Sequence, residues 1–213
     1  MDFSVIITAG GTSSRYGRKN KLLEKINGKT VIEYTVEKFY GLKEIIICAN
    51  ESIIPNLKKL FPQEIKIIKG GKTRQESVYN GLKECSGKYV IIHDGARPLI
   101  SKKIINDVKR EVKIKNALTV AVKTVDTIKK ADKTGKISET IDRSNLYNIQ
   151  TPQAFKTDLI KEVHEKLKGQ NFTDDAGMLE NSGYEVFIVE GEYKNIKLTT
   201  KDDLNFIKLY IQK

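Results

Sequence analysis

Short runs of apolar residues alternate with amphipathic segments in the first half of the chain. The runs at 3–7, 44–49 and 88–93 are continuous rather than alternating in polarity, as is typical of strands buried on both faces. Between them, the pattern predicts helices at 30–41 and from the cluster KTRQES to near Gly87. Strands that alternate with helices indicate right-handed βαβ units, so we predict an α/β fold with a mostly parallel sheet.

The alternation continues to residue 122 and then changes. A helix at 101–114 and a strand at 117–122 precede a polar β-hairpin at about 124–148, whose turn lies at Lys133-Thr134-Gly135. This arm has too little apolar surface to stand alone, so it either folds over its own domain or reaches a second subunit. After TPQAF, to which we assign no element, we expect a helix at 157–168, a helix opening at FTDDA, strands EVFIVE and NIKLT, and a last helix capped by Thr200.

Composition limits the class of protein. The chain has 213 residues, of which 39% are hydrophobic, enough for one substantial core, and we predict a single domain over 1–213. No signal-peptide pattern opens it, and no apolar stretch approaches the length needed to span a bilayer. With only two cysteines, Cys48 and Cys85, and two histidines, a Cys/His metal site is not expected. Cys48 is interpreted as a small buried hydrophobe. A cytoplasmic protein without membrane association is the expectation.

The charge suggests an anionic ligand. The net charge of +11 first suggests nucleic acid. However, the lysines are scattered through every segment, without a block of like charge or the aromatic interleaving that base stacking needs. Anionic small molecules therefore fit better, and no nucleic-acid partner is expected.

Three polar, glycine-containing loops follow predicted strands directly: GGTSSR, GGKTR and HDGARP. Ligands of parallel sheets bind outside the carboxyl ends of the strands, so these loops are expected to form one site. In the first loop, Gly10 and Gly11 precede the cations Arg15, Arg18, Lys19 and Lys21, a combination that suits phosphate. Neither G-x-x-x-x-G-K-[ST] nor G-x-G-x-x-G is present.

Few side chains suggest catalysis on their own. Asp94 follows a buried strand, where a carboxylate could bind Mg²⁺ carried by phosphates or close its own turn. Arg97 is expected to be extended and to point outward, and Arg15 and Lys21 could stabilise charge on a phosphate. Asp174 and Asp175 could complement a helix dipole. His93 is interpreted as a strand-end residue and His164 as a helix-surface residue. The residues alone therefore predict a polyanion site that handles phosphate with help from Mg²⁺.

Several motifs in order resemble one family over nearly the whole chain: AGG(x)3R…K, R-x-x-S-V, HDGARP, DR-x-x-L-Y…QTPQAF, TDDA and NIKLTT. This set is similar to the 2-C-methyl-D-erythritol 4-phosphate cytidylyltransferases of the non-mevalonate isoprenoid pathway. The resemblance implies a Rossmann-like nucleotidyltransferase fold and a homodimer formed through the protruding arm. It also implies an Mg²⁺-dependent reaction of CTP with methylerythritol phosphate, which yields 4-diphosphocytidyl-2-C-methylerythritol and pyrophosphate.

The resemblance also implies roles for individual residues. Arg15 and Lys21 match the pair that stabilises the transition state, and Arg143 and Lys197 match the residues that orient the attacking phosphate. Matches to the nucleotide site and to the acceptor site form two larger sets. The nucleotide set is Ala9, Gly10, Gly11, Gly71, Ser77 and Asp94, with Asp94 also near the metal. The acceptor set is Arg97, Thr127, Arg143, Thr151, Thr173 and Lys197, with Thr127 and Arg143 expected from the partner's arm.

Three positions depart from the family pattern, which has Ala-Ala-Gly, Pro-Lys-Gln and an aspartate where this chain has Thr8-Ala9-Gly10, Asn20-Lys21-Leu22 and Lys72. Two alternative functions remain open. A ribitol-5-phosphate cytidylyltransferase shares most of the motifs, and R-x-x-S-V and TDDA favour the methylerythritol enzyme over it. A catalytically idle nucleotide-binding relative would have no need to keep Arg15, Lys21, Asp94, Arg143 and Lys197 together.

Overall fold

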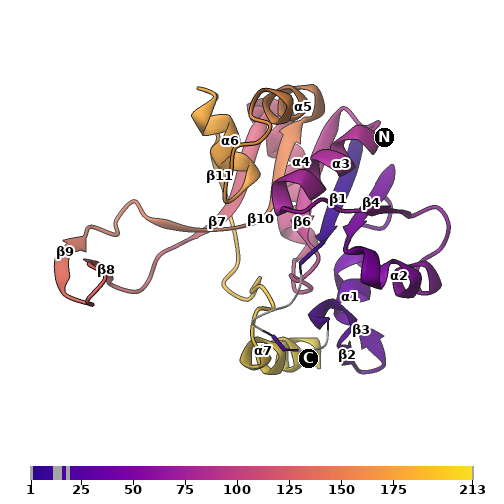
Figure 1. Cartoon of the computed structure of the whole chain (residues 1–213), viewed down its shortest axis with the longest axis horizontal. Helices are drawn as coiled ribbons and strands as arrows, with labels where there is room; N and C mark the ends of the chain where they lie inside the picture. The colour runs from indigo at the N-terminus through magenta and orange to yellow at the C-terminus, as the bar shows by residue number, and fades with distance from the viewer. Residues whose placement is uncertain (1, 12–15, 18–19, 213) are drawn as a thin grey trace.

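The computed structural model describes residues 2–11, 16–17 and 20–212. A seven-stranded sheet has the order β11-β7-β10-β6-β1-β4-β5 and lies between two layers of helices (Figure 1). Its strands are β1 (Phe3–Ala9), β4 (Glu44–Ala49), β5 (Lys66–Lys69), β6 (Tyr89–Asp94), β7 (Ala117–Lys123), β10 (Tyr147–Lys156) and β11 (Phe187–Glu190). All neighbours in this sheet pair in parallel except β10, which is antiparallel to both β6 and β7. The predicted α/β fold with a mostly parallel sheet is confirmed.

The helices cover both faces of the sheet because side chains along each strand alternate between them. In β1, Val5 and Ile7 pack into one apolar cluster, while Ile6 packs into the other. Helices α1 (Val31–Glu37), α2 (Ile54–Leu60), α4 (Lys102–Lys115) and α7 (Lys201–Ile211) contribute to the first cluster. Helices α3 (Arg74–Glu84), α5 (Thr157–Lys166) and α6 (Asp175–Asn181) contribute to the second.

Hydroxyl caps begin several of these helices, as predicted for two of them. Thr30 and Thr200 each accept a backbone N–H three residues ahead and complete capping boxes with Glu33 and Asp203. Four shorter elements lie in the first quarter of the chain: β2 (Lys25–Ile26), β3 (Lys29–Thr30) and the 3₁₀ turns η1 (Lys21–Leu23) and η2 (Glu51–Ile53). In the described part of the chain, no helix is both long and apolar enough to cross a membrane.

The arm leaves the sheet between β7 and β10 and extends away from the body (Figure 1). It contains β8 (Ile128–Ala131) and β9 (Ile137–Ile141), which pair with each other in antiparallel register. All four residues of β8 are exposed. Asp132 closes the tip, where its carboxylate accepts hydrogen bonds from Thr134 and Lys136. The hairpin expected at about 124–148 is therefore present, and it does not fold over its own body.

Two assignments from the sequence differ from the structure. The segment TPQAF, to which the sequence pattern assigns no element, lies within β10 in the interior of the sheet. Conversely, the segment predicted as the strand NIKLT has no strand geometry. It crosses the carboxyl edge as a loop, where Leu198 is buried and its N–H donates to the carbonyl of Ala96. The buried side chains of Asn195 and Leu198 and hydrogen bonds to neighbouring parts of the chain hold this segment, so its alternation of apolar and polar residues does not reflect pairing in a sheet.

Candidate active site

A cavity of about 390 Å³ lies at the carboxyl ends of β1, β5 and β6, where the three polar loops meet. The first loop contributes Gly10 and Gly11, the second Gly71 and Arg74, and the third Asp94. The loop after β11 adds Lys197 and Thr199. The convergence expected from a parallel sheet is therefore observed for the described parts of these loops.

Gly10 in the first loop and Gly71 in the second allow both loops to lie close to the first turns of helix α3. A Cβ at Gly71 would lie 2.1 Å from Cβ of Glu76, and a Cβ at Gly10 would lie 3.1 Å from Oγ of Ser77. Oγ of Ser77 accepts the N–H of Gly71 and donates to the carbonyl of Thr73. Ser77 thus ties the second glycine pair to the start of α3 and fixes the shape of this cavity wall.

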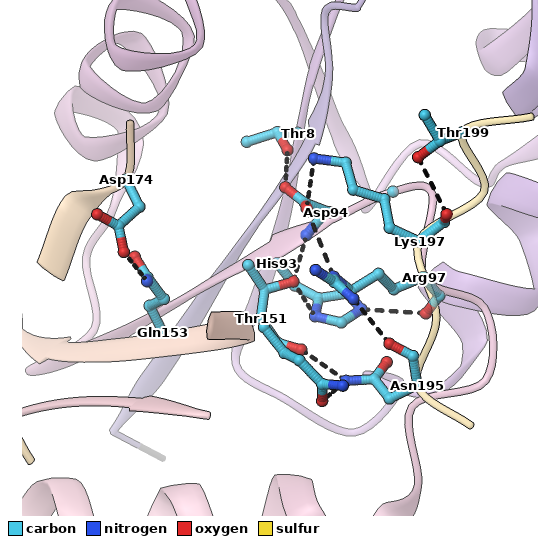
Figure 2. Close-up of polar contacts among 12 residues, drawn as sticks. Thr8, His93, Asp94, Arg97, Thr151, Gln153, Asp174, Asn195, Lys197 and Thr199 are labelled. Atoms are coloured by element: carbon cyan, nitrogen blue, oxygen red, sulfur yellow. Dashed lines mark hydrogen bonds and ion pairs between the residues drawn. The ribbon is translucent and has the colours of Figure 1, made fainter. Parts of the chain in front are cut away.

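Asp94 ends β6 and is the centre of the polar contacts in the site (Figure 2). Its Oδ2 lies 2.9 Å from Nζ of Lys197 and 3.6 Å from Nε of Arg97, while Oδ1 accepts from Thr8 Oγ1 at 3.3 Å. Burial alone would raise the pKa of Asp94, but Lys197, Arg74 and Arg97 outweigh burial and hold that pKa well below its usual range. The carboxylate is therefore ionised at neutral pH.

Polar side chains behind Asp94 fix its backbone. The N–H of Asp94 donates to Oγ1 of Thr151, and that hydroxyl also contacts Nδ1 of His93 at 3.1 Å (Figure 2). His93 is fully buried at the end of β6, and burial lowers its pKa to about 4. It is therefore neutral at pH 7 and supports Asp94 from behind, in agreement with its interpretation as a strand-end residue.

The expectation that Arg97 points outward is wrong. Its Nη1 donates to the carbonyl of Asn195 at 2.7 Å, and its side chain is only 11% exposed (Figure 2). The amide of Asn195 in turn donates to Oε1 of Gln150 and to the carbonyl of Thr151. Arg97 therefore joins the third loop to the 195–199 segment, a contact between distant parts of the chain that local sequence does not show.

His164 was also misplaced, since it is buried rather than on the helix surface. Its Nε2 lies 3.2 Å from Oδ1 of Asp175, which is fully buried as well. Asp174, by contrast, caps α6 by accepting the N–H of Gly177, as a residue at a helix start is expected to do. The second aspartate of the TDDA motif therefore serves an internal ion pair rather than the helix dipole alone.

The structure divides the predicted site residues into four groups. Ala9, Gly10, Gly11, Lys21, Gly71, Ser77, Asp94 and Lys197 line the cavity. Arg97 and Thr151 lie behind Asp94, and Thr173 is exposed beside α6. Thr127 and Arg143 belong to the arm, and neither is among the residues that line the cavity of their own chain. The prediction for Arg15, like the cations Arg18 and Lys19, lies outside the described residues.

Several lining residues were not named as site residues: Thr8, Tyr16, Leu22, Lys72, Thr73, Arg74, Ala96 and Thr199. Lys72, Thr73 and Arg74 belong to the polar cluster after Gly70-Gly71, so their place after a strand was a usable signal. Tyr16 and Thr199 carried no such signal.

The charges of the lining define the ligand chemistry. Among the described lining residues, Lys21, Lys72, Arg74 and Lys197 are cationic and Asp94 alone is acidic. Together with the glycine turns at the strand ends, this lining suits a ligand with several negative charges. The fold and site thus define a three-layer α/β protein with a polyanion cavity at the carboxyl edge of its sheet.

Comparison with known proteins gives the family. The family model described as IspD, 2-C-methyl-D-erythritol 4-phosphate cytidylyltransferase, matches residues 3–213. A protein of that name from Caldanaerobacter subterraneus is 41% identical, with 100% of each chain covered. Another from Bacillus mycoides is 42% identical, with 99% of each chain covered. The chain belongs to the 2-C-methyl-D-erythritol 4-phosphate cytidylyltransferase family.

Solved structures agree with this assignment. The 4-diphosphocytidyl-2C-methyl-D-erythritol synthase of Anaerococcus prevotii superposes with a TM-score of 0.88 at 32% identity, covering 100% of this chain and 99% of the other. The 2-C-methyl-D-erythritol 4-phosphate cytidylyltransferase of Thermus thermophilus gives a TM-score of 0.87 at 28% identity, with both chains fully covered. The Rossmann-like nucleotidyltransferase fold expected from the motifs is confirmed.

Proposed function

We propose that this protein is a cytidylyltransferase that joins CTP and 2-C-methyl-D-erythritol 4-phosphate, releasing pyrophosphate. A phosphate oxygen of the acceptor attacks the α-phosphorus of CTP, one P–O bond forms, and the bond to the pyrophosphate leaving group breaks. Family membership supports the choice of reaction. The observation that carries it at the level of residues is the lining of the cavity, which combines the cations Lys21, Lys72, Arg74 and Lys197 with one carboxylate, Asp94, beside two glycine turns.

The chemistry requires cations more than a base. The nucleophile is already an anion, so the barrier lies in bringing two polyanions together in line. Gly10 and Gly11 are assigned to the triphosphate, and Lys21 with Arg15 to the charge that develops on the α-phosphate. Lys197 is assigned to the acceptor phosphate. His93, neutral and enclosed behind Asp94, has no part in proton transfer.

Mg²⁺ is the metal proposed for the reaction. The described residues contain no group of three or more His, Cys, Asp or Glu side chains that could hold a metal ion by themselves. Mg²⁺, however, commonly needs only one or two protein carboxylates when phosphates complete its ligands. Asp94, ionised and at the cavity wall, fits that requirement. When bound, the ion would supply charge neutralisation on the nucleotide phosphates.

The arm is assigned to a second copy of the chain in a homodimer. Arg143 donates from Nη1 to the carbonyl of Val125, and neither Arg143 nor Thr127 lines the cavity of its own chain. The arm extends outward with Val125 and Ile137 exposed, so it offers apolar surface to a partner (Figure 1). We place Thr127 and Arg143 at the acceptor end of the cavity of the neighbouring chain. A cytoplasmic location is part of the same proposal.

The test is pyrophosphate release with CTP and Mg²⁺, comparing methylerythritol phosphate with ribitol 5-phosphate as acceptor. Release with the first and not the second is expected. Release only with ribitol 5-phosphate would assign the alternative substrate, and no release with either acceptor would overturn the proposal. Omitting CTP or replacing it with ATP provides the background rate.

A further inference from the structure

A line of polar and charged side chains in mutual contact runs from inside the second helix layer to the cavity wall. It begins at His164 on α5 and passes through Asp175 at the start of α6 to Arg74 at the start of α3. Nη1 of Arg74 lies 2.7 Å from Oδ2 of Asp175, and Nε of Arg74 lies 3.8 Å from Oδ1 of Asp94. Arg74 therefore stands between two buried carboxylates, one deep in the protein and one at the cavity.

Asp175 is an expensive group to bury, and the fold supports it from several sides. An ionised carboxylate without solvent costs several kcal/mol unless opposite charge compensates for it. Burial would raise the pKa of Asp175, yet Arg74 and His164 outweigh burial and lower it. Because the carboxylate is ionised, it accepts at Oδ1 the hydrogen that Nε2 of His164 carries.

Strand β10 fixes the place of this carboxylate in the fold. Oε1 of Gln153 accepts the backbone N–H groups of Asp175 and Ala176, and Nε2 of Gln153 donates to Asp174. These bonds attach the first turn of α6 to the central antiparallel strand of the sheet (Figure 2). The same strand carries Thr151, which holds the backbone N–H of Asp94. Side chains of the same strand, β10, therefore hold the backbones of both Asp94 and Asp175, whose carboxylates face Arg74.

The guanidinium group of Arg74 faces these two carboxylates while its side chain also forms part of the cavity wall. Nη2 is closed off from solvent and has no hydrogen-bond partner among the described residues, and Nη1 faces Asp175. The remaining polar edge, Nε, faces Oδ1 of Asp94. Lys197 and Arg97 contact the other oxygen, Oδ2. Arg74 is thus the one of the three cations that acts on the Oδ1 side of Asp94.

We propose that Arg74 is a positioning residue for Asp94, and that Asp175 and His164 hold Arg74 in place from behind. The role rests on the proposed function, because Asp94 is assigned there to the nucleotide and its metal. Arg74 balances Lys197 across the carboxylate, which keeps Asp94 from turning wholly toward Lys197. The orientation of Asp94 needed for CTP is then built into the protein before the nucleotide binds.

A double-mutant cycle tests whether Arg74 acts through Asp94. Arg74→Gln and Asp94→Asn are each expected to weaken CTP binding about tenfold, measured by calorimetry without acceptor, because coupled charged groups interact by that order. The double variant is expected to bind CTP no more weakly than the weaker single variant. Additive losses would overturn the proposal, since Arg74 would then act independently of Asp94.

Two further variants separate positioning from general destabilisation. Arg74→Gln leaves Asp175 without its cation, so the neutral pair Arg74→Gln/Asp175→Asn is measured beside it, with thermal unfolding as the check on folding. Arg74→Lys, which keeps the positive charge but loses the planar guanidinium group, is expected to restore part of the CTP affinity. No recovery in Arg74→Lys, with folding intact, would contradict the role of the charge. Arg110→Gln, on the exposed face of α4, is the matched control and is expected to bind CTP as the wild type does.

The outcomes distinguish this inference from the proposed function. A wild-type chain that binds CTP and releases pyrophosphate, with an additive cycle, overturns only the role of Arg74. A wild-type chain that binds CTP without releasing pyrophosphate overturns the proposed reaction. The double-mutant cycle then still tests the role of Arg74, because it is measured by CTP binding. A wild-type chain that binds no CTP overturns both.

Discussion

The cavity edge and the arm present charged side chains in opposite ways. At the cavity edge, Asp94 is 8% exposed in its side chain and is surrounded by Lys197, Arg97 and Arg74. Further contacts hold Arg97 and Arg74 in place. On the arm, Arg143 is exposed and makes a bond to the nearby carbonyl of Val125. The first region is organised within one chain, whereas the second is organised only as a hairpin. In the proposed function, the described part of the nucleotide half therefore lies within one chain, and the acceptor half is assigned to the arm of a second copy.

The largest difference is expected in folding stability. Phe155→Ala removes a fully buried ring from β10 and is expected to lower the free energy of unfolding by about 3–5 kcal/mol. Ile137→Ala on the arm removes a side chain that is 59% exposed and is expected to change it by less than about 0.5 kcal/mol. Urea unfolding followed by circular dichroism, at a concentration where the chain is monomeric, measures both. Equal losses would show that the arm belongs to the cooperative core.

The next effect concerns catalysis at the cavity edge. Lys197→Ala is expected to lower kcat by roughly 10²–10³-fold, because it removes a cation placed beside the reacting phosphates. Pyrophosphate release measures the rate, and calorimetry checks that CTP still binds. Lys201→Ala, at the exposed start of α7 and outside the cavity lining, is the control and should leave kcat unchanged. An unchanged kcat in Lys197→Ala would remove this residue from the mechanism.

A smaller effect is expected when the charge on the arm is removed. Arg143→Ala should raise KM for methylerythritol phosphate about tenfold to a hundredfold, the worth of a charge-assisted hydrogen bond, and leave the Kd for CTP unchanged. Initial rates at varied acceptor concentration give this KM. Lys133→Ala at the tip of the arm is the control. A parallel loss of CTP affinity would contradict the division between the two halves of the site.

Mixing impaired subunits sharpens the same comparison, when the acceptor concentration is well below the KM of the Arg143→Ala variant so that this variant alone is nearly silent. If each site combines one chain's cavity with the other chain's arm, Lys21→Ala and Arg143→Ala chains should complement each other. Random exchange makes half of the dimers mixed, each with one intact site, so about a quarter of the wild-type activity should return. An activity no higher than that of the separate variants would place the arm in its own chain's site.

The smallest effect is expected in the pH dependence of stability. The lowered pKa of Asp175 stabilises the folded state above the unfolded-state pKa of about 3.9, and this contribution is lost as the pH falls through the folded-state pKa. Asp175→Asn should therefore flatten the loss of unfolding free energy below about pH 4. The pKa of Asp142 on the arm is lowered by Ser144, but Asp142 is exposed and solvent screens its charge. Asp142→Asn should leave the pH dependence of the unfolding free energy unchanged. Urea unfolding at a series of pH values from acid to neutral measures both variants.

Local sequence predicted the elements whose signal is itself local. The continuous apolar runs in β1, β4 and β6 identified the centre of the sheet, and hydroxyl residues identified the starts of two helices. The placement of loops after strands was enough to bring Gly10, Gly71 and Asp94 to one cavity. These inferences needed only periodicity and the rule that parallel strands end at one edge.

Contacts between distant segments were not predictable in the same way. The inward turn of Arg97 depends on a carbonyl of Asn195, and the burial of His164 depends on Asp175 from a different helix. Strand β10 was missed because its residues Gln150, Thr151 and Gln153 are polar yet buried. Their polarity serves hydrogen bonds to α6, to Asp94 and to the 195–199 segment, so the strand looks like a loop in sequence.

The attachment of the arm has a consequence for how such a protein can evolve. Chain leaves the body at Lys123 of β7 and returns at Tyr147 of β10, and these two residues are paired neighbours in the sheet. An excursion between adjacent antiparallel positions can be lengthened, shortened or rewritten without shifting the register of either strand. In the proposed dimer, selection can therefore alter which subunits recognise each other while the residues assigned to the nucleotide stay where they are.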